Sequence, residues 1–306
     1  ALVRNKIQNL WFSPLPYCRF NHFCDTILAM EQRTNDVPRL FAASFSPPGL
    51  ASGGAVGISS LTGSADAFVA LALTKSGPPS TDGRLVLAVV PGLPEADRLT
   101  DDLRLLTSDA KGQNASAYST RILEFPPLLD GDKSALGIRL KTIAAIRSWG
   151  ISPYPCVVVA SFPALSAPIP AGTLPALVLG NASDHFSSVG NTLPKLGYTR
   201  VPTVEHEGDY SIRGGIVDVW SPGEEFPIRA EFFGEDLESL RTFDAATQLS
   251  IERIATATLL PVSLGESEKT QQLADILPDN AALLAIEHND YAIESTLGKR
   301  SFATVY

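Results

Sequence analysis

Two continuous runs of apolar residues mark strands that are buried on both faces. Residues 84–91 read Arg-Leu-Val-Leu-Ala-Val-Val-Pro and residues 156–160 read Cys-Val-Val-Val-Ala. A strand with one buried face alternates apolar and polar positions, whereas a strand covered on both sides stays apolar throughout. We therefore predict that both runs lie inside a sheet that has helices on both faces.

Predicted helices separate these strands: one is rich in alanine and leucine, one should follow the first strand, and one has apolar residues near helical spacing. Residues 65–74, 94–106 and 136–149 are predicted to be helices, and residues 1–50 to contain one or two more. Alternating strands and helices are typical of right-handed β-α-β units, which build a parallel sheet. The first half of the chain is therefore predicted to be an α/β domain, to which residues 174–180 add one further strand.

The pattern changes to long β segments beyond residue 165. After a predicted helix at residues 184–196, apolar and polar positions alternate, as they do in strands with one buried face. The predicted strands cover residues 210–220, 228–233, 237–243 and 250–262. Because turn residues at 221–224 and 234–236 join successive strands, we expect an antiparallel meander.

This change of pattern predicts three segments. Residues 1–165 form the first part of the α/β domain, residues 166–247 form a small α+β domain, and residues 248–306 form the second part of the α/β domain. The last segment contains a predicted helix–strand pair at residues 268–286. The small domain thus interrupts the larger one.

Composition narrows the classes of function. The chain has 306 residues, with 33 acidic and 24 basic side chains and a net charge of −9, which disfavours a surface built to bind nucleic-acid phosphates in bulk. Three cysteines make no disulfide framework, so we expect a reducing compartment, the cytoplasm. We find neither an export signal nor the ~18 consecutive apolar residues of a membrane span.

Cys18, His22 and Cys24 are close enough in sequence to suggest a metal site. A structural zinc site needs a second pair of ligands at a similar spacing, and the remaining cysteine and histidines do not supply one. An apolar helix face explains these three residues better. We predict no metal and no cofactor.

One segment resembles a nucleotide-binding loop that has lost its chemistry. A P-loop, G-x-x-x-x-G-K-[ST], wraps phosphates with backbone N–H groups and adds a lysine and a hydroxyl. Here Ser60 and Ala65 replace the two glycines, Asp66 replaces the lysine and Ala67 replaces the hydroxyl residue, while Gly63 remains inside the loop. A carboxylate at the lysine position repels a triphosphate. We therefore predict no nucleotide hydrolysis.

The alternative for this segment is an ordinary helix N-terminus capped by Thr62 or Ser64. A non-standard nucleotide site would need another cation near the loop. Lys75 lies roughly two helical turns further along and cannot easily reach it.

A long ordered pattern in the second half carries a family resemblance. It consists of LGYTRV at 196–201, EGDYSIRGGIVDVWSPG at 207–223, PIRAEFFGE at 227–235 and ESLRTFD at 238–244. This pattern resembles the UvrB-homology module at the N-terminus of bacterial transcription-repair coupling factors (Mfd). The match is dense over residues 196–262, looser in the segments before it, and hardly present in residues 1–50.

UvrB itself shares the pattern, and two features separate the two families. UvrB is expected to keep an intact phosphate loop and a tyrosine-rich hairpin. In this chain the phosphate loop is degenerate, and residues 107–135 contain a single tyrosine, Tyr118. UvrB also tends to carry R-x-R-G where this chain has Ser211, Arg213 and Gly214. The resemblance therefore favours the coupling factor and implies a degenerate helicase-like, P-loop-derived fold.

The resemblance implies that the small domain docks UvrA, the damage-recognition ATPase of nucleotide-excision repair. The arginines implicated in that family correspond to Arg200 and Arg213, and guanidinium groups are frequent interface anchors. The alternative for each is a solvated charge or an ion pair within the domain.

Arg229 and Arg241 alternate with apolar residues and are interpreted as structural. Residues 193–262 contain twelve acidic and six basic side chains, a balance that suits a specific protein contact better than DNA binding.

The predicted function is a non-catalytic adaptor that recruits UvrA and so links stalled RNA polymerase to nucleotide-excision repair. The resemblance implies that the full-length parent is an ATP-dependent translocase on double-stranded DNA, and no motif of that translocase or of a polymerase-binding domain occurs in these 306 residues. The alternatives are a UvrB-like ATP-dependent repair enzyme with a non-standard nucleotide site and a separate paralogue with its own partner.

Overall fold

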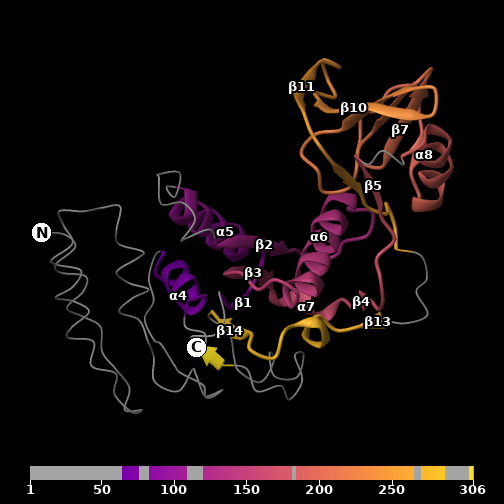
Figure 1. Ribbon diagram of the computed structural model, residues 1–306. Helices are drawn as coiled ribbons and strands as arrows, with labels where there is room; N and C mark the ends of the chain where they lie inside the picture. Colours follow the sequence, from indigo (N-terminus) through magenta and orange to yellow (C-terminus); the bar gives the residue numbers. More distant parts are fainter. Residues whose placement is uncertain are drawn as a thin grey trace, which may run out of the picture. The chain divides into compact units, whose positions relative to one another are not determined.

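The computed structural model of this chain contains two compact units (Figure 1). The first takes its residues from 1–125, 146–166 and 273–306, and the second consists of 126–145 and 167–272. The structure describes residues 64–75, 83–108, 120–180, 184–264, 270–286 and the backbone of 303–305. The helices predicted within residues 1–50 lie outside this range.

The first unit contains a five-stranded sheet in which every pair of neighbours is parallel. The strand order is β15-β14-β1-β3-β2. The strands are β1 (Leu85–Val90), β2 (Arg121–Phe125), β3 (Cys156–Ser161), β14 (Ala282–Ala285) and β15 (Ala303–Val305). Every residue of β1 and β3 is buried, which confirms the prediction from the two continuous apolar runs.

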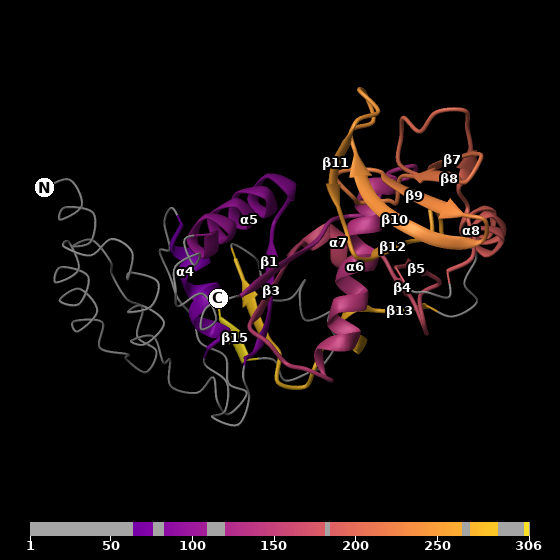
Figure 2. The ribbon, with the colours of Figure 1, turned by 45° about the horizontal axis from the view of Figure 1, so that its top comes forward.

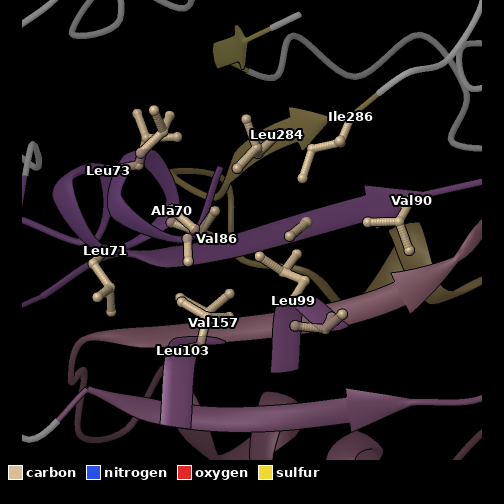
Figure 3. Packing of buried hydrophobic residues seen from close by; sticks show 14 of the residues in the cluster. Ala70, Leu71, Leu73, Val86, Val90, Leu99, Leu103, Val157, Leu284 and Ile286 are labelled. Atoms are coloured by element: carbon tan, nitrogen blue, oxygen red, sulfur yellow. The ribbon is translucent and has the colours of Figure 1, made fainter. Parts of the chain in front are cut away.

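Helices α4 (Ala65–Leu73) and α5 (Leu93–Ser108) cover this sheet. Figure 3 shows their side chains meeting those of the strands in one core, where Leu73, Leu99, Val86, Val157 and Leu284 are all buried. Burying each such side chain stabilises the fold by about 1.5–3 kcal/mol. Both helices were predicted from the sequence, and α6 (Lys133–Trp149) was predicted from apolar spacing. The short helix α7 (Phe162–Ser166) follows β3.

The second unit contains a six-stranded sheet with the order β11-β10-β9-β8-β7-β6. Its neighbours are antiparallel except for the parallel pair β6 and β7. Strands β9 and β10 lie side by side in Figure 2. The strands are β6 (Thr199–Arg200), β7 (Asp209–Arg213), β8 (Ile216–Val219), β9 (Ile228–Phe233), β10 (Asp236–Phe243) and β11 (Ser250–Arg253). The predicted antiparallel meander is confirmed.

One face of this sheet packs on helix α8 (Phe186–Thr192) and the 3₁₀ turn η5 (Pro194–Leu196). Val189, Leu196, Val217 and Ala230 belong to the buried cluster between them. Two short antiparallel pairs complete the unit. These pairs are β5 (Leu177–Leu179) with β12 (Ala257–Leu259), and β4 (Ile169–Pro170) with β13 (Thr270–Gln271).

The structure corrects the single strand predicted over residues 210–220, because a turn divides it into β7 and β8. Gly214 has φ +60°, a backbone conformation that favours glycine. A Cβ on Gly215 would lie 2.5 Å from the carbonyl oxygen of Phe232 on the next strand. Gly214 thus supplies the positive φ of the turn, and Gly215 allows the close approach to β9.

Three other predicted elements also differ. Residues 250–262 form two strands, β11 and β12, that belong to different sheets. Residues 174–180 do not join the parallel sheet, because β5 pairs antiparallel with β12. The helix predicted ahead of β14 is a single 3₁₀ turn, η6 (Leu273–Ile276). Over the ranges that the structure describes, no helix is long and apolar enough to cross a membrane.

Candidate protein-docking site

Arg213 ends β7 directly before the glycine turn, and 52% of its side chain is exposed. Its Nη2 donates a hydrogen bond to Oδ2 of Asp218 at 2.7 Å. The intradomain ion pair that the sequence left open for Arg213 is therefore present. A guanidinium group has five N–H donors, so a single bond to Asp218 leaves most of them to face solvent or a partner.

Asp218 is a buried carboxylate shared by two arginines. Only 1% of its side chain is exposed, and it lies on β8 in the middle of the sheet. Arg229 on β9 donates from Nε to Oδ1 at 2.6 Å and from Nη2 to Oδ2 at 2.9 Å. Its guanidinium also lies over the ring of Phe243, 4.6 Å from the ring centroid. The hydrogen bonds to Asp218 raise the pKa of Arg229 above its ordinary value.

The two arginines therefore differ in their roles. Arg229, 16% exposed, makes a two-bond pair with Asp218 and is tied into the domain. Arg213 is the second cation on one carboxylate, so the cluster of Arg213, Asp218 and Arg229 carries a formal charge of +1 on an otherwise acidic domain. This surplus positive charge is half exposed at the end of a strand.

A second ion pair lies beside this cluster, on strands β9 and β10 of the same sheet. Arg241 on β10 donates to Glu231 on β9 at 2.8 Å, and Ser239 donates to the same carboxylate at 2.7 Å. Arg229 and Arg241 lie directly opposite each other in the strand register, and each has its own carboxylate. We define the charged face as the side of the sheet that carries Arg213, Asp218, Arg229, Glu231 and Arg241.

Arg200 lies elsewhere. It is exposed on the edge strand β6, and its register partner on β7 is Tyr210, whose ring is buried in the core between sheet and helix. Register partners point to the same face and successive residues to opposite faces, so Arg213, three residues beyond Tyr210, lies on the other side. Among the residues that the structure describes, no hydrogen bond or ion pair holds the Arg200 side chain. The structure does not bring the two predicted arginines together.

A buried tyrosine fixes the start of the strand that carries Arg200. The hydroxyl of Tyr198 donates to the carbonyl oxygen of Leu260 at 2.8 Å. The N–H of Leu260 donates in turn to Oγ of Ser221 at 3.0 Å. Burial raises the pKa of Tyr198, so the phenol stays protonated and remains a donor. Sequence reasoning missed this role, although Tyr198 is part of the LGY motif.

The predicted phosphate loop falls partly within the described residues. Ser60 and Gly63 lie outside them, while Ala65, Asp66 and Ala67 form the first turn of α4. Ser64 precedes the helix but its side chain makes no capping hydrogen bond, which corrects that half of the alternative drawn from the sequence.

Asp66, at the lysine position of a P-loop, is itself ion-paired. Its carboxylate is buried, and Oδ2 accepts a hydrogen bond from Nη2 of Arg98 on α5 at 2.7 Å. Arg98 thus places a cation at the start of α4, and the Asp66 carboxylate binds that cation. No sequence spacing indicated this pair, since 32 residues separate its members.

A metal site is not indicated by the geometry. Within the described ranges, no three histidine, cysteine, aspartate or glutamate side chains are grouped so that they could hold a metal ion. Cys18, His22 and Cys24 lie outside those ranges.

Comparison with known proteins identifies the part of the chain that carries this site. Residues 181–264 match the family model described as the UvrB interaction domain. The transcription-repair-coupling factor of Mycobacterium tuberculosis is 33% identical over 237 residues, which cover 76% of this chain and 18% of that protein. The factor of Bacillus subtilis is 25% identical over 177 residues, covering 58% and 15% respectively. This chain is similar to one part of the transcription-repair-coupling factors.

The resemblance read from the sequence is thereby confirmed. The factor of Escherichia coli is 38% identical over 69 residues, which cover 22% of this chain and 6% of that protein. The chain spans about a fifth of the length of the Mycobacterium relatives that it matches. The UvrB interaction domain match contains Arg200, Arg213 and the whole charged face.

We predict that Asp218→Asn destabilises the protein by about 3 kcal/mol, because removing one member of a buried ion pair leaves the other charge uncompensated. Glu231→Gln is the matched control, since its pair with Arg241 is about one-third exposed and is worth at most about 1 kcal/mol. Urea denaturation followed by circular dichroism measures both. Equal losses for the two variants would contradict this account of Asp218.

Proposed function

We propose that this chain is the part of a transcription-repair coupling factor that recruits UvrA, and that it acts as a non-catalytic adaptor in nucleotide-excision repair. The docking residues are Arg200 and Arg213, within the small domain predicted at residues 166–247. The observation that carries the proposal is the half-exposed Arg213, bound to the buried Asp218 inside the UvrB interaction domain match.

The chemistry of the site suits recognition of a protein. Arg213 offers a rigid fork of N–H donors, and such a fork binds a partner carboxylate through two parallel hydrogen bonds. Asp218 keeps this side chain in place before binding, which lowers the entropy lost on association. The acidic surround repels nucleic acid and favours a few specific contacts.

The other partners belong to the proposed full-length factor. By the resemblance, that factor binds RNA polymerase and translocates on double-stranded DNA, through parts other than the docking domain. The relatives' name joins transcription to repair, which is the link that an adaptor for UvrA supplies.

The proposal that this chain is not an ATPase rests on Asp66. The parallel sheet with α4 and α5 against it is the architecture expected of a helicase-like, P-loop-derived domain. At the lysine position, the buried Asp66 binds Arg98 of the same chain instead of a phosphate. We propose that this internal ion pair stands where a nucleotide would be held in an active relative.

We predict that Arg200→Ala and Arg213→Ala each weaken binding of UvrA by about 2 kcal/mol, or about 30-fold in Kd, as expected when an interface anchor is removed. Isothermal titration calorimetry with purified UvrA measures the affinity. Arg253→Ala on β11 is the matched control, because this exposed arginine lies at the opposite edge of the sheet from β6 and should leave the affinity unchanged. Unchanged affinity in both predicted variants would reject these docking residues.

We also predict that Mg-ATP at millimolar concentration leaves the melting temperature of the chain unchanged, because a ligand that does not bind cannot stabilise the fold. Differential scanning fluorimetry measures this shift, with intact UvrB as a positive control. A saturable rise in melting temperature that disappears in Arg98→Ala, which removes the cation beside Asp66, would instead favour the UvrB-like enzyme.

A further inference from the structure

Phe233 is the most exposed large apolar side chain of the docking domain. It ends β9 with 76% of its surface exposed, whereas the preceding Phe232 is buried in the core. Single exposed apolar residues are common on protein surfaces and need no function. Phe233 differs from such residues in where it lies and in how firmly its strand is held.

Strand register places Phe233 on the charged face. Arg213 pairs with Ile216, and Ile216 pairs with Glu231, so these three residues share a face. Phe233 follows Glu231 by two positions and therefore points to the same side. Two strand spacings, roughly 10 Å, separate the strand of Arg213 from that of Phe233, which is close enough for one binding partner to contact both side chains.

The surface around Phe233 is open. The N–H of Phe232 donates to the carbonyl oxygen of Gly215 at 2.7 Å, which brings the β7–β8 turn beside the end of β9. Gly214 in that turn and Gly234 directly after Phe233 both have positive φ, and a Cβ built on either would meet nothing within 4 Å. The two turns therefore leave space beside the exposed ring.

The hairpin that carries Phe233 is held in place from its other side. The N–H of Phe186 donates to the carbonyl oxygen of Glu235, and the N–H of Ser187 donates to its carboxylate, both at 3.0 Å. Hydrogen bonding from Ser187 lowers the pKa of the Glu235 carboxyl below its ordinary value. The rings of Phe186 and Phe232 also pack edge to face, with centroids 5.5 Å apart. Phe233 is thus presented on a fixed support.

We propose that Phe233 and Arg213 form one contact surface for UvrA, with Phe233 as its apolar anchor. The matching surface on the partner is an apolar recess bordered by a carboxylate, because the recess takes the ring and the carboxylate takes the guanidinium. Aromatic residues and arginines dominate the energetics of such contacts. This inference rests on the proposed function and adds an apolar anchor beside Arg213 on the charged face.

The test is calorimetric titration of the whole chain with UvrA. Phe233→Ala is expected to weaken binding at least tenfold and to leave the urea midpoint of unfolding unchanged, since the ring makes little contact with the fold. Ile251→Ala is the matched control, because this side chain is 50% exposed on β11 at the far edge of the same sheet. Phe233→Leu should recover part of the affinity.

Two results separate this inference from the proposed function. If the wild-type chain does not bind UvrA, the proposed function fails and the inference fails with it. If the wild type binds and Arg213→Ala weakens binding, but Phe233→Ala does not, the docking function holds and the inference is overturned. Equal weakening by Phe233→Ala and Ile251→Ala also overturns it, because the effect is then not specific to the part of the sheet that carries Phe233 and Arg213.

Discussion

The six-stranded sheet of the second unit depends on one buried carboxylate, Asp218. Burying an ionised group costs several kcal/mol unless hydrogen-bonded partners compensate for the lost water. Arg229 compensates with two short bonds from the next strand, and its own cation packs on the ring of Phe243. Since that pair is already neutral, Arg213 adds a surplus positive charge, and half of its side chain is exposed. Exposure rises accordingly from the shared carboxylate to the surplus cation: 1% of the side chain for Asp218, 16% for Arg229 and 52% for Arg213.

The first unit uses the same kind of interaction to the opposite effect. Buried Asp66 binds Arg98 directly at the start of α4, where an active P-loop protein would hold phosphate oxygens with a lysine. Asp66 thus pairs with a single arginine, whereas Asp218 holds a second, half-exposed arginine in addition to its own partner. Both arrangements are consistent with the proposed role of this chain as an adaptor that recognises a protein and does not hydrolyse a nucleotide.

The parts of this molecule that follow from local composition could be predicted, and those that depend on register could not. Burial on both faces leaves only apolar residues, so β1 and β3 were evident from the sequence. The turn at Gly214 was missed, because β-branched residues typical of strands continue on both sides of the two glycines. The two arginines that bind Asp218 lie on the neighbouring strands β7 and β9. Only the pairing of these strands with β8 brings the three side chains together. The exposure of Phe233 does follow from the alternation along β9, because Ile228, Ala230 and Phe232 take the buried face and leave Phe233 on the opposite one.

Backbone hydrogen exchange in the presence of UvrA tests the central claim most directly. If the charged face is the docking surface, exchange slows at the β7–β8 and β9–β10 turns, around Gly214 and Gly234, when UvrA is added. Exchange in β1 and α5 of the parallel-sheet unit then stays unchanged. Protection confined to the parallel-sheet unit, with both turns exchanging as in the free chain, would contradict the account.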